Sequence, residues 1–141
     1  MKKFEEYVQE GVVRRIFADV NRSKNIYSEA LRKYQSLQYN ISKLGVSDDN
    51  ANDFIEHCYD CIMFLIRSKL FKEGFKCIGL GAHEAEVSFS LNIGFSESDM
   101  RFLDELRYFR NGILYYGKRF DVEYAQKVTE FTHKIFEREN I

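Results

Sequence analysis

The chain has 141 residues, of which 45% are hydrophobic and 30% are charged, and its net charge is −1. This balance is typical of one folded globular domain, and it excludes both a disordered chain and a protein with a strong overall basic field. The sequence contains no proline, the strongest helix breaker, together with 13 phenylalanines and 9 tyrosines. These numbers favour a chain that is helical nearly throughout and has an aromatic-rich core or interface.

Two helical segments are predicted in the N-terminal third of the chain. Apolar residues recur at helical spacing over residues 4–20, so residues 1–20 are expected to form an accessory N-terminal helix. The same spacing continues over residues 24–43 and ends at Gly45, a residue suited to a left-handed helix stop. The residues between them are compatible with an interruption or a capped restart, so one kinked helix and two helices both stay open.

The most apolar helix is predicted in the middle of the chain, over residues 52–72, and it is expected to lie at the centre of the fold. Cys58 and Cys61 lie in this helix with the spacing of a metal or redox pair. No second pair follows, so we favour buried packing cysteines. The glycine-rich residues 74–81 lack the lysine and the full spacing of a phosphate loop, and they are expected to form a connecting turn.

A short helix is predicted over residues 82–91, where His83 and Glu84 stand together. A zinc-binding helix needs a second histidine one turn later, and none follows, so no metal is assigned. His83 is a candidate for orienting a substrate or partner, and a surface or capping histidine is the alternative. The last helix is expected to begin after Asp121, whose carboxylate can cap it.

The most informative feature is an arginine on the apolar face of the helix predicted between about Ser96 and Gly117. At about 100° per residue, Arg110 falls inside an apolar arc that extends from Phe102 to Tyr116. Burying an unpaired guanidinium is costly, so Arg110 requires either a carboxylate on a neighbouring helix or a groove that a ligand can enter. Residues 101–119 carry five basic residues against two acidic ones, a strip that fits RNA, an acidic partner or a solvated face.

Arg110 is followed by Asn111 and a short apolar run, late in a small helical chain, and this pattern resembles the signature of the HEPN family. The stretch around His83 and Glu84 is a softer second match to that family. The resemblance implies an all-α, up-and-down four-helix bundle with short accessory helices, in a single domain over residues 1–141. It also implies a homodimer, in which the two arginine-bearing helices face one another across a cleft.

In the HEPN family a histidine follows the arginine by a little more than one helical turn, and Tyr115, Tyr116 and Gly117 occupy that place here. Metal-independent RNA cleavage needs a cation for the developing phosphate charge, a role that suits Arg110, and a base. Tyrosine is a poor base at neutral pH, so binding without efficient cleavage is expected. The candidate catalytic residues are Arg110, Asn111 and Tyr115, and the candidate residues for binding RNA or a partner are Arg107, Arg110, Asn111, Tyr115, Tyr116 and His83.

Such proteins resemble the companions of minimal nucleotidyltransferases in toxin–antitoxin pairs, so a partner of that kind is expected. Three hypotheses stay open: a degenerate HEPN protein that binds RNA or that partner, a metal-independent ribonuclease using Arg110 with Tyr115 or His83, and a structural interaction module. No cofactor is expected. The chain shows no signal-peptide pattern and no apolar run long enough to cross a bilayer, so we expect a cytoplasmic protein without membrane contact.

Overall fold

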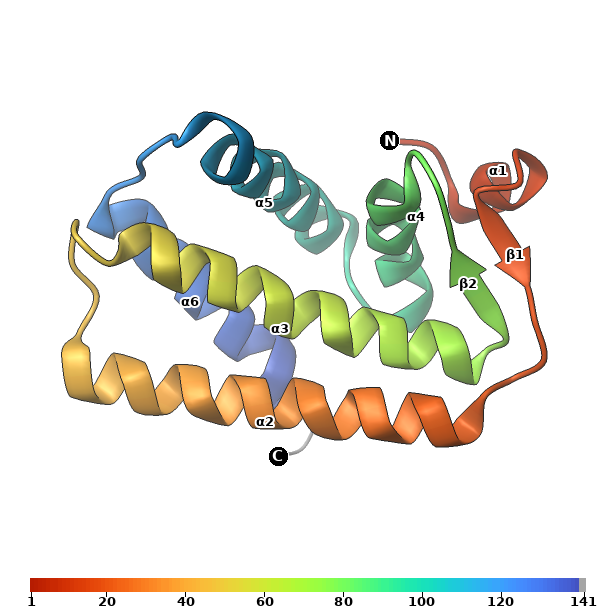
Figure 1. Cartoon of the computed structure of the whole chain (residues 1–141), viewed down its shortest axis with the longest axis horizontal. Helices are drawn as coiled ribbons and strands as arrows, with labels where there is room; N and C mark the ends of the chain where they lie inside the picture. Colours follow the sequence, from red (N-terminus) through yellow and green to blue (C-terminus); the bar gives the residue numbers. More distant parts are fainter. Residues whose placement is uncertain (140–141) are drawn as a thin grey trace. The chain divides into compact units, whose positions relative to one another are not determined.

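The computed structural model describes residues 1–139 of the chain, and this part is mostly helical, as the sequence predicts. The up-and-down four-helix bundle and the single domain remain predictions. Two short strands, which were not predicted, accompany the helices. The elements in chain order are α1 (Phe4–Gln9), β1 (Val13–Arg15), α2 (Val20–Leu44), α3 (Ala51–Lys72), β2 (Phe75–Cys77), α4 (Ala82–Phe89), a 3₁₀ turn (Ser90–Ile93), α5 (Glu97–Tyr116) and α6 (Val122–Glu137) (Figure 1).

The chain divides into two compact units. The first unit consists of residues 1–28 and 63–105, and the second of residues 29–62 and those from 106 onward. Helices α2, α3 and α5 each contribute residues to both units. None of the helices within residues 1–139 is long and apolar enough to cross a membrane.

In the first unit, a two-stranded antiparallel ribbon packs with two short helices. Val13 of β1 stands opposite Cys77 of β2. Strand β1 contacts α1, strand β2 contacts α4, and the two helices contact each other. The Phe4 ring of α1 lies 5.1 Å from the Phe75 ring and 4.9 Å from the Phe89 ring. This aromatic cluster joins α1, β2 and α4.

The predicted helix over residues 1–20 is wrong beyond its first turns. Gly11 adopts the left-handed conformation, with φ at 81°, which favours glycine and ends α1. The β-branched residues that follow lead into β1, and Phe17 is left 98% exposed. Helical spacing in this segment therefore does not reflect a helix with a buried face.

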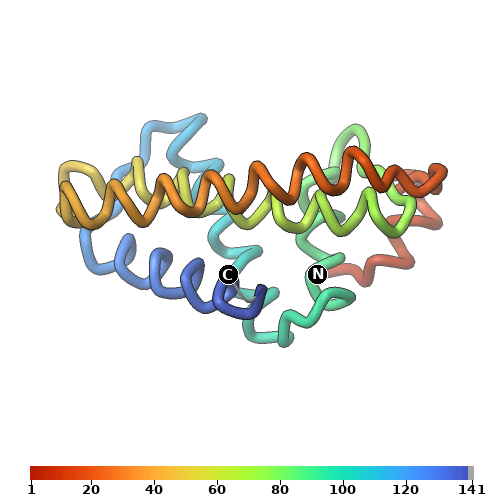
Figure 2. The backbone as a smooth tube through the Cα atoms, turned by 90° about the horizontal axis from the view of Figure 1, so that it is seen from below, coloured from red at the N-terminus to blue at the C-terminus, as the bar shows by residue number. Residues whose placement is uncertain are grey.

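The predicted turn over residues 74–81 is also only partly correct, because it contains β2. Gly74 has a φ of 80°, and a Cβ there would lie 2.8 Å from the carbonyl oxygen of Ile16. The Ile16 amide donates to the Gly74 carbonyl at 2.8 Å, which closes one end of the ribbon. Helix α2 in turn begins at Val20 and runs without the interruption that was considered near residue 22 (Figure 2).

The second unit consists of helical segments of α2, α3 and α5 together with the whole of α6. Tyr34 of α2 stacks on Phe136 of α6, with ring centroids 4.4 Å apart and an interplanar angle of 9°. Gly45 ends α2 with a φ of 68°, and the Asp121 side chain caps α6 by accepting from the Tyr124 amide at 3.0 Å, as predicted. The buried apolar side chains of this unit include Leu37, Phe54, Ile55, Cys58, Ile62, Leu106, Val128, Ile135 and Phe136.

Candidate functional site

Helix α5, which carries Arg110, has a defined beginning and end. The Asp99 amide donates to Ser96 Oγ at 3.0 Å and the Ser96 amide donates to the Asp99 carboxylate at 3.2 Å, a reciprocal cap of the N-terminus. At the other end, Gly117 has a φ of 62° and its amide donates to the Ile113 carbonyl at 3.1 Å. These caps place Arg110 and the residues after it in the last two turns of α5.

Arg110 lies in the second unit and is only partly paired. One of its Nη atoms is 3.8 Å from a carboxylate oxygen of Asp60, and its guanidinium lies 5.2 Å from the centre of the Tyr59 ring. The distance to Asp60 exceeds that of a hydrogen bond, so the contact is mainly coulombic. The Nε atom is buried without a hydrogen-bond partner, while 24% of the side chain is exposed. Arg110 is therefore neither sealed in the core nor satisfied by its neighbours.

The tyrosines at the end of α5 face solvent. Tyr115 is 73% exposed and Tyr116 is 87% exposed, and Leu114 is also exposed. Tyr116, the last residue of the predicted apolar arc, is therefore not on a buried face, because the last turn of α5 is mostly uncovered. Asn111, beside Arg110, is half-buried.

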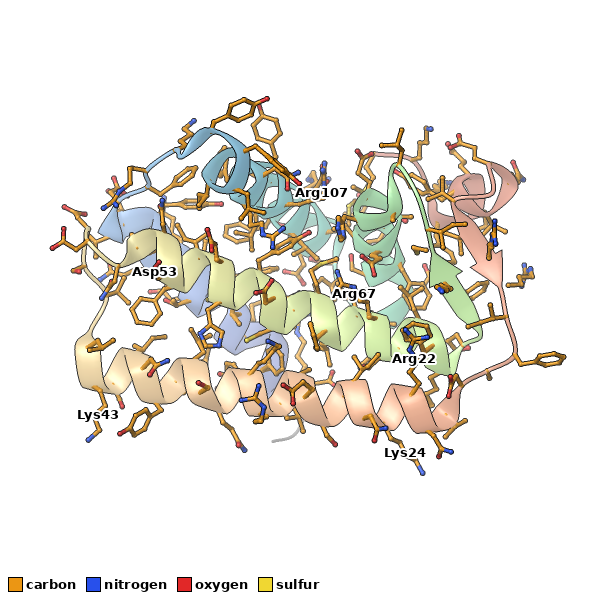
Figure 3. The ribbon with its side chains drawn as sticks, viewed as in Figure 1. Arg22, Lys24, Lys43, Asp53, Arg67 and Arg107 are labelled. Carbon is orange, nitrogen blue, oxygen red and sulfur yellow. The ribbon has the colours of Figure 1, made fainter. Side chains whose placement is uncertain are left out.

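Arg107 lies one turn before Asn111 on α5 and is half-buried (Figure 3). One short stretch of α5 thus carries Arg107, Arg110, Asn111, Tyr115 and Tyr116. Within residues 1–139, no hydrogen bond or ring contact joins Tyr115 to Arg110. Among the described residues, no histidine forms a hydrogen bond, ion pair or ring contact with Arg110. The arrangement offers a cation and aromatic rings, with no imidazole bonded to that cation within residues 1–139.

The loop after α5 carries two more basic residues and is anchored to α3. The Asn52 side chain donates to the Lys118 carbonyl at 2.8 Å and accepts from the Phe120 amide at 2.9 Å. Arg119 donates to the backbone carbonyl of Asp48 at 3.2 Å. An open cavity of about 520 Å³ is lined by Asp48, Lys118, Arg119, Phe120, Asp121 and Tyr124. Its two carboxylates and two cations offset each other, so charge alone selects no ligand there.

His83 lies in the first unit, where it joins a network that the sequence did not reveal. Its Nδ1 atom is 3.0 Å from Glu86 Oε1, and Arg67 Nε is 2.6 Å from the other carboxylate oxygen. Only 8% of the Glu86 side chain is exposed. Because a carboxylate only accepts hydrogen bonds, Nδ1 carries the proton in the neutral ring and Nε2 is left as an acceptor. Arg67 Nη2, 3.5 Å from Nδ1, then makes a charge contact rather than a hydrogen bond. The spacing of His83 and Glu86, three residues apart on one helix, was the available signal.

All three cysteines are free thiols. Cys58 and Cys61 are buried in α3, which confirms the prediction of packing cysteines, and Cys77 of β2 is half-buried. Burial raises the pKa of the Cys58 thiol to about 12, and it also raises the pKa of Cys61. Burial raises the pKa of Cys77 to about 12 as well. Residues 1–139 hold no cluster of three or more histidine, cysteine, aspartate or glutamate side chains arranged for a metal.

Each unit contains a group of side chains that could bind a ligand or take part in a reaction. The end of α5 presents an underpaired guanidinium with exposed phenol rings, which suits the recognition of an anion that carries planar groups. The His83–Glu86 pair presents an oriented imidazole beside Arg67, which suits proton transfer. Comparison of the chain with protein-family models, with characterised proteins and with solved structures gives no match.

Proposed function

We propose that this chain is a HEPN-like helical protein that binds RNA through the C-terminal half of α5 and does not cleave it efficiently. The observation that carries the proposal is the state of Arg110, whose Nε has no acceptor and whose nearest carboxylate is 3.8 Å away. A buried donor without an acceptor costs about 1–3 kcal/mol, and a guanidinium gains more from phosphate when it is not already paired. Phosphate is the ligand whose paired oxygens fit this group.

The exposed rings of Tyr115 and Tyr116 support RNA over other anions. Aromatic side chains stack on unpaired bases, and each stacked base contributes about 1–3 kcal/mol. Asn111 adjoins Arg110 and can hydrogen-bond to a phosphate or a sugar hydroxyl. Cleavage requires a base near the attacking hydroxyl, and Arg110 has no histidine among its contacts in residues 1–139. The homodimer and the nucleotidyltransferase-type partner remain predictions.

A binding assay with matched variants tests the proposal. Fluorescence anisotropy of a labelled single-stranded RNA, with chelator present, is compared among the wild type, Arg110→Ala, Arg110→Lys and Arg101→Ala. Arg101 is an exposed residue of the same helix and pairs with Glu97 at 3.7 Å, so its replacement removes the same charge outside the proposed site. Arg110→Ala is expected to weaken binding about tenfold, Arg110→Lys by less, and Arg101→Ala little. Equal affinities of the wild type and Arg110→Ala would contradict the proposal.

A second function, metal-independent ribonuclease activity, is favoured by the geometry of His83. Its free Nε2 and its bond to buried Glu86 are the features of an oriented general base, and Arg67 supplies a cation 3.5 Å from the ring. Gel analysis of the RNA after incubation distinguishes the two functions. Intact RNA supports binding alone, whereas cleavage that His83→Gln abolishes would establish the nuclease.

A further inference from the structure

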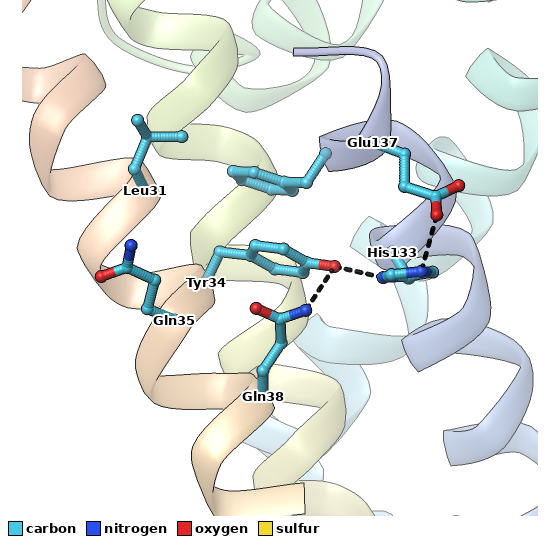
Figure 4. Close-up of a pocket in the computed structure, with 7 residues that line it drawn as sticks. Leu31, Tyr34, Gln35, Gln38, His133 and Glu137 are labelled. Carbon is cyan, nitrogen blue, oxygen red and sulfur yellow. Dashed lines mark hydrogen bonds and ion pairs between the residues drawn. The ribbon is translucent and has the colours of Figure 1, made fainter. Parts of the chain in front are cut away.

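The second unit contains a small pocket that neither Arg110 nor His83 lines. It has a volume of about 230 Å³ and lies between α2 and α6 (Figure 4). Pockets for drug-sized ligands usually measure about 300–1,000 Å³, so this one suits a smaller molecule or a single side chain. Its lining residues are Leu31, Tyr34, Gln35, Gln38, His133, Phe136 and Glu137.

A chain of hydrogen bonds along the pocket fixes the proton positions. His133 Nε2 is 3.0 Å from Glu137, and because a carboxylate only accepts, Nε2 carries the proton in the neutral ring. His133 Nδ1 is then an acceptor, and the Tyr34 hydroxyl donates to it. Burial, with the charge of Glu137 adding to it, raises the pKa of Tyr34 to about 12, which keeps this hydroxyl protonated at neutral pH.

The same chain determines which polar atoms remain for a ligand. Tyr34 uses its only proton on His133, so its oxygen must accept from Gln38, whose Nε2 lies 3.2 Å away. The carbonyl oxygen of Gln38 and the second carboxylate oxygen of Glu137 are left as acceptors. The Gln35 amide makes no hydrogen bond with another residue of the described chain. The atoms left free are thus three acceptor oxygens, of Gln35, Gln38 and Glu137, of which the last is charged, together with amide N–H donors of the two glutamines.

The walls of the pocket add an apolar surface to these acceptors. Leu31 and the stacked rings of Tyr34 and Phe136 form it. The Glu137 carboxylate repels an anion, and both nitrogens of His133 are already engaged within the chain of hydrogen bonds, which removes them as metal ligands. A hydrogen-bond donor with a positive charge and a short aliphatic stem matches the remaining surface.

We infer that this pocket binds an organic cation, an ammonium or guanidinium group carried on a short aliphatic chain. The charged group pairs with the Glu137 carboxylate, which lies at one end of the pocket beside His133 (Figure 4). The stem lies against Leu31 and the two stacked rings. Such a group belongs to free alkylamines and equally to the lysine or arginine side chain of another protein, and the recognition chemistry is the same for both. This inference does not depend on RNA binding at α5.

Nuclear magnetic resonance titration with butylammonium chloride tests the inference. Butylammonium is expected to shift the amide resonances of the α2 and α6 residues around the pocket, whereas 1-butanol and sodium pentanoate, which have the same butyl stem, are expected to leave them unchanged. Glu137→Gln is expected to weaken butylammonium binding about fivefold, as for an exposed ion pair. The matched control is Glu130→Gln, which removes an exposed carboxylate from the same helix outside the pocket.

A blocked pentapeptide with one central lysine separates the two sources of the cation. Tighter binding of the peptide than of butylammonium identifies a protein side chain as the occupant, and the reverse identifies a free amine. Equal shifts with butanol and butylammonium would overturn the inference, and so would unchanged affinity in Glu137→Gln. Absence of shifts with both cations would overturn it as well.

Discussion

Replacing Glu86 by glutamine removes the charge at the centre of the Arg67–Glu86–His83 network while keeping the side-chain volume. In the first unit, Arg67 contacts both carboxylate oxygens, at 2.6 and 3.3 Å, and His83 contacts one of them at 3.0 Å. Removing one partner of a buried ion pair costs about 3–5 kcal/mol. Arg67 is 29% exposed and can be partly solvated, so Glu86→Gln is expected to lower the free energy of unfolding by about 2 kcal/mol.

Urea unfolding followed by circular dichroism at 222 nm measures this loss. The matched control is Glu29→Gln, which also removes one negative charge from a pair with an arginine, here the exposed Arg32. Exposed ion pairs contribute little to stability, so the control is expected to have the same free energy of unfolding as the wild type. If Glu86→Gln is no less stable than Glu29→Gln, the network does not hold α4 to α3, and the orientation assigned to His83 loses its support.

Three further outcomes follow from the structure. Tyr34→Phe leaves the polar groups of His133 and Gln38 without their shared partner, and it is expected to lower the free energy of unfolding by about 1 kcal/mol, measured in urea. Because burial raises the pKa of Cys58 to about 12, this thiol is expected to react with Ellman's reagent at pH 8 only after unfolding, and rapid reaction of the native protein would contradict that. Burial lowers the pKa of His57, so the unfolded chain binds the extra proton: stability is expected to fall as the pH drops below about 6.5, and to fall less in His57→Gln, as measured by urea midpoints at pH 7.5 and 5.5.

The long helices, whose ends are marked by nearby capping residues and glycines, could be predicted from the sequence. The two-stranded ribbon could not. The helix predicted over residues 52–72 is found as Ala51–Lys72, and Gly45 and Asp121 mark helix ends as expected. These signals act within a few residues. Val13 pairs with Cys77, which lies far along the chain. Because the strand depends on this distant partner, the residues next to Val13 do not indicate it. Its apolar neighbours fit helical spacing equally well.

Some residues of the candidate site could likewise be predicted from the sequence, and others could not. Arg110 and its tyrosines could be identified because they follow one another on a single helix. The Asp60 carboxylate and the Tyr59 ring could not be named, because which face of α3 meets α5 depends on packing rather than on periodicity. The links between Tyr34 and His133, and between Arg67 and Glu86, were missed for the same reason, since each joins two elements.

The proposed role of Arg110 is tested most directly by the salt dependence of RNA binding. For a single-stranded nucleic acid, each phosphate contact adds about 0.7 to the slope of log affinity against log salt concentration. The slope for Arg110→Ala is therefore expected to be smaller than that of the wild type by about 0.7, while Arg101→Ala keeps the wild-type slope. Parallel lines for the wild type and Arg110→Ala would show that Arg110 does not contact phosphate.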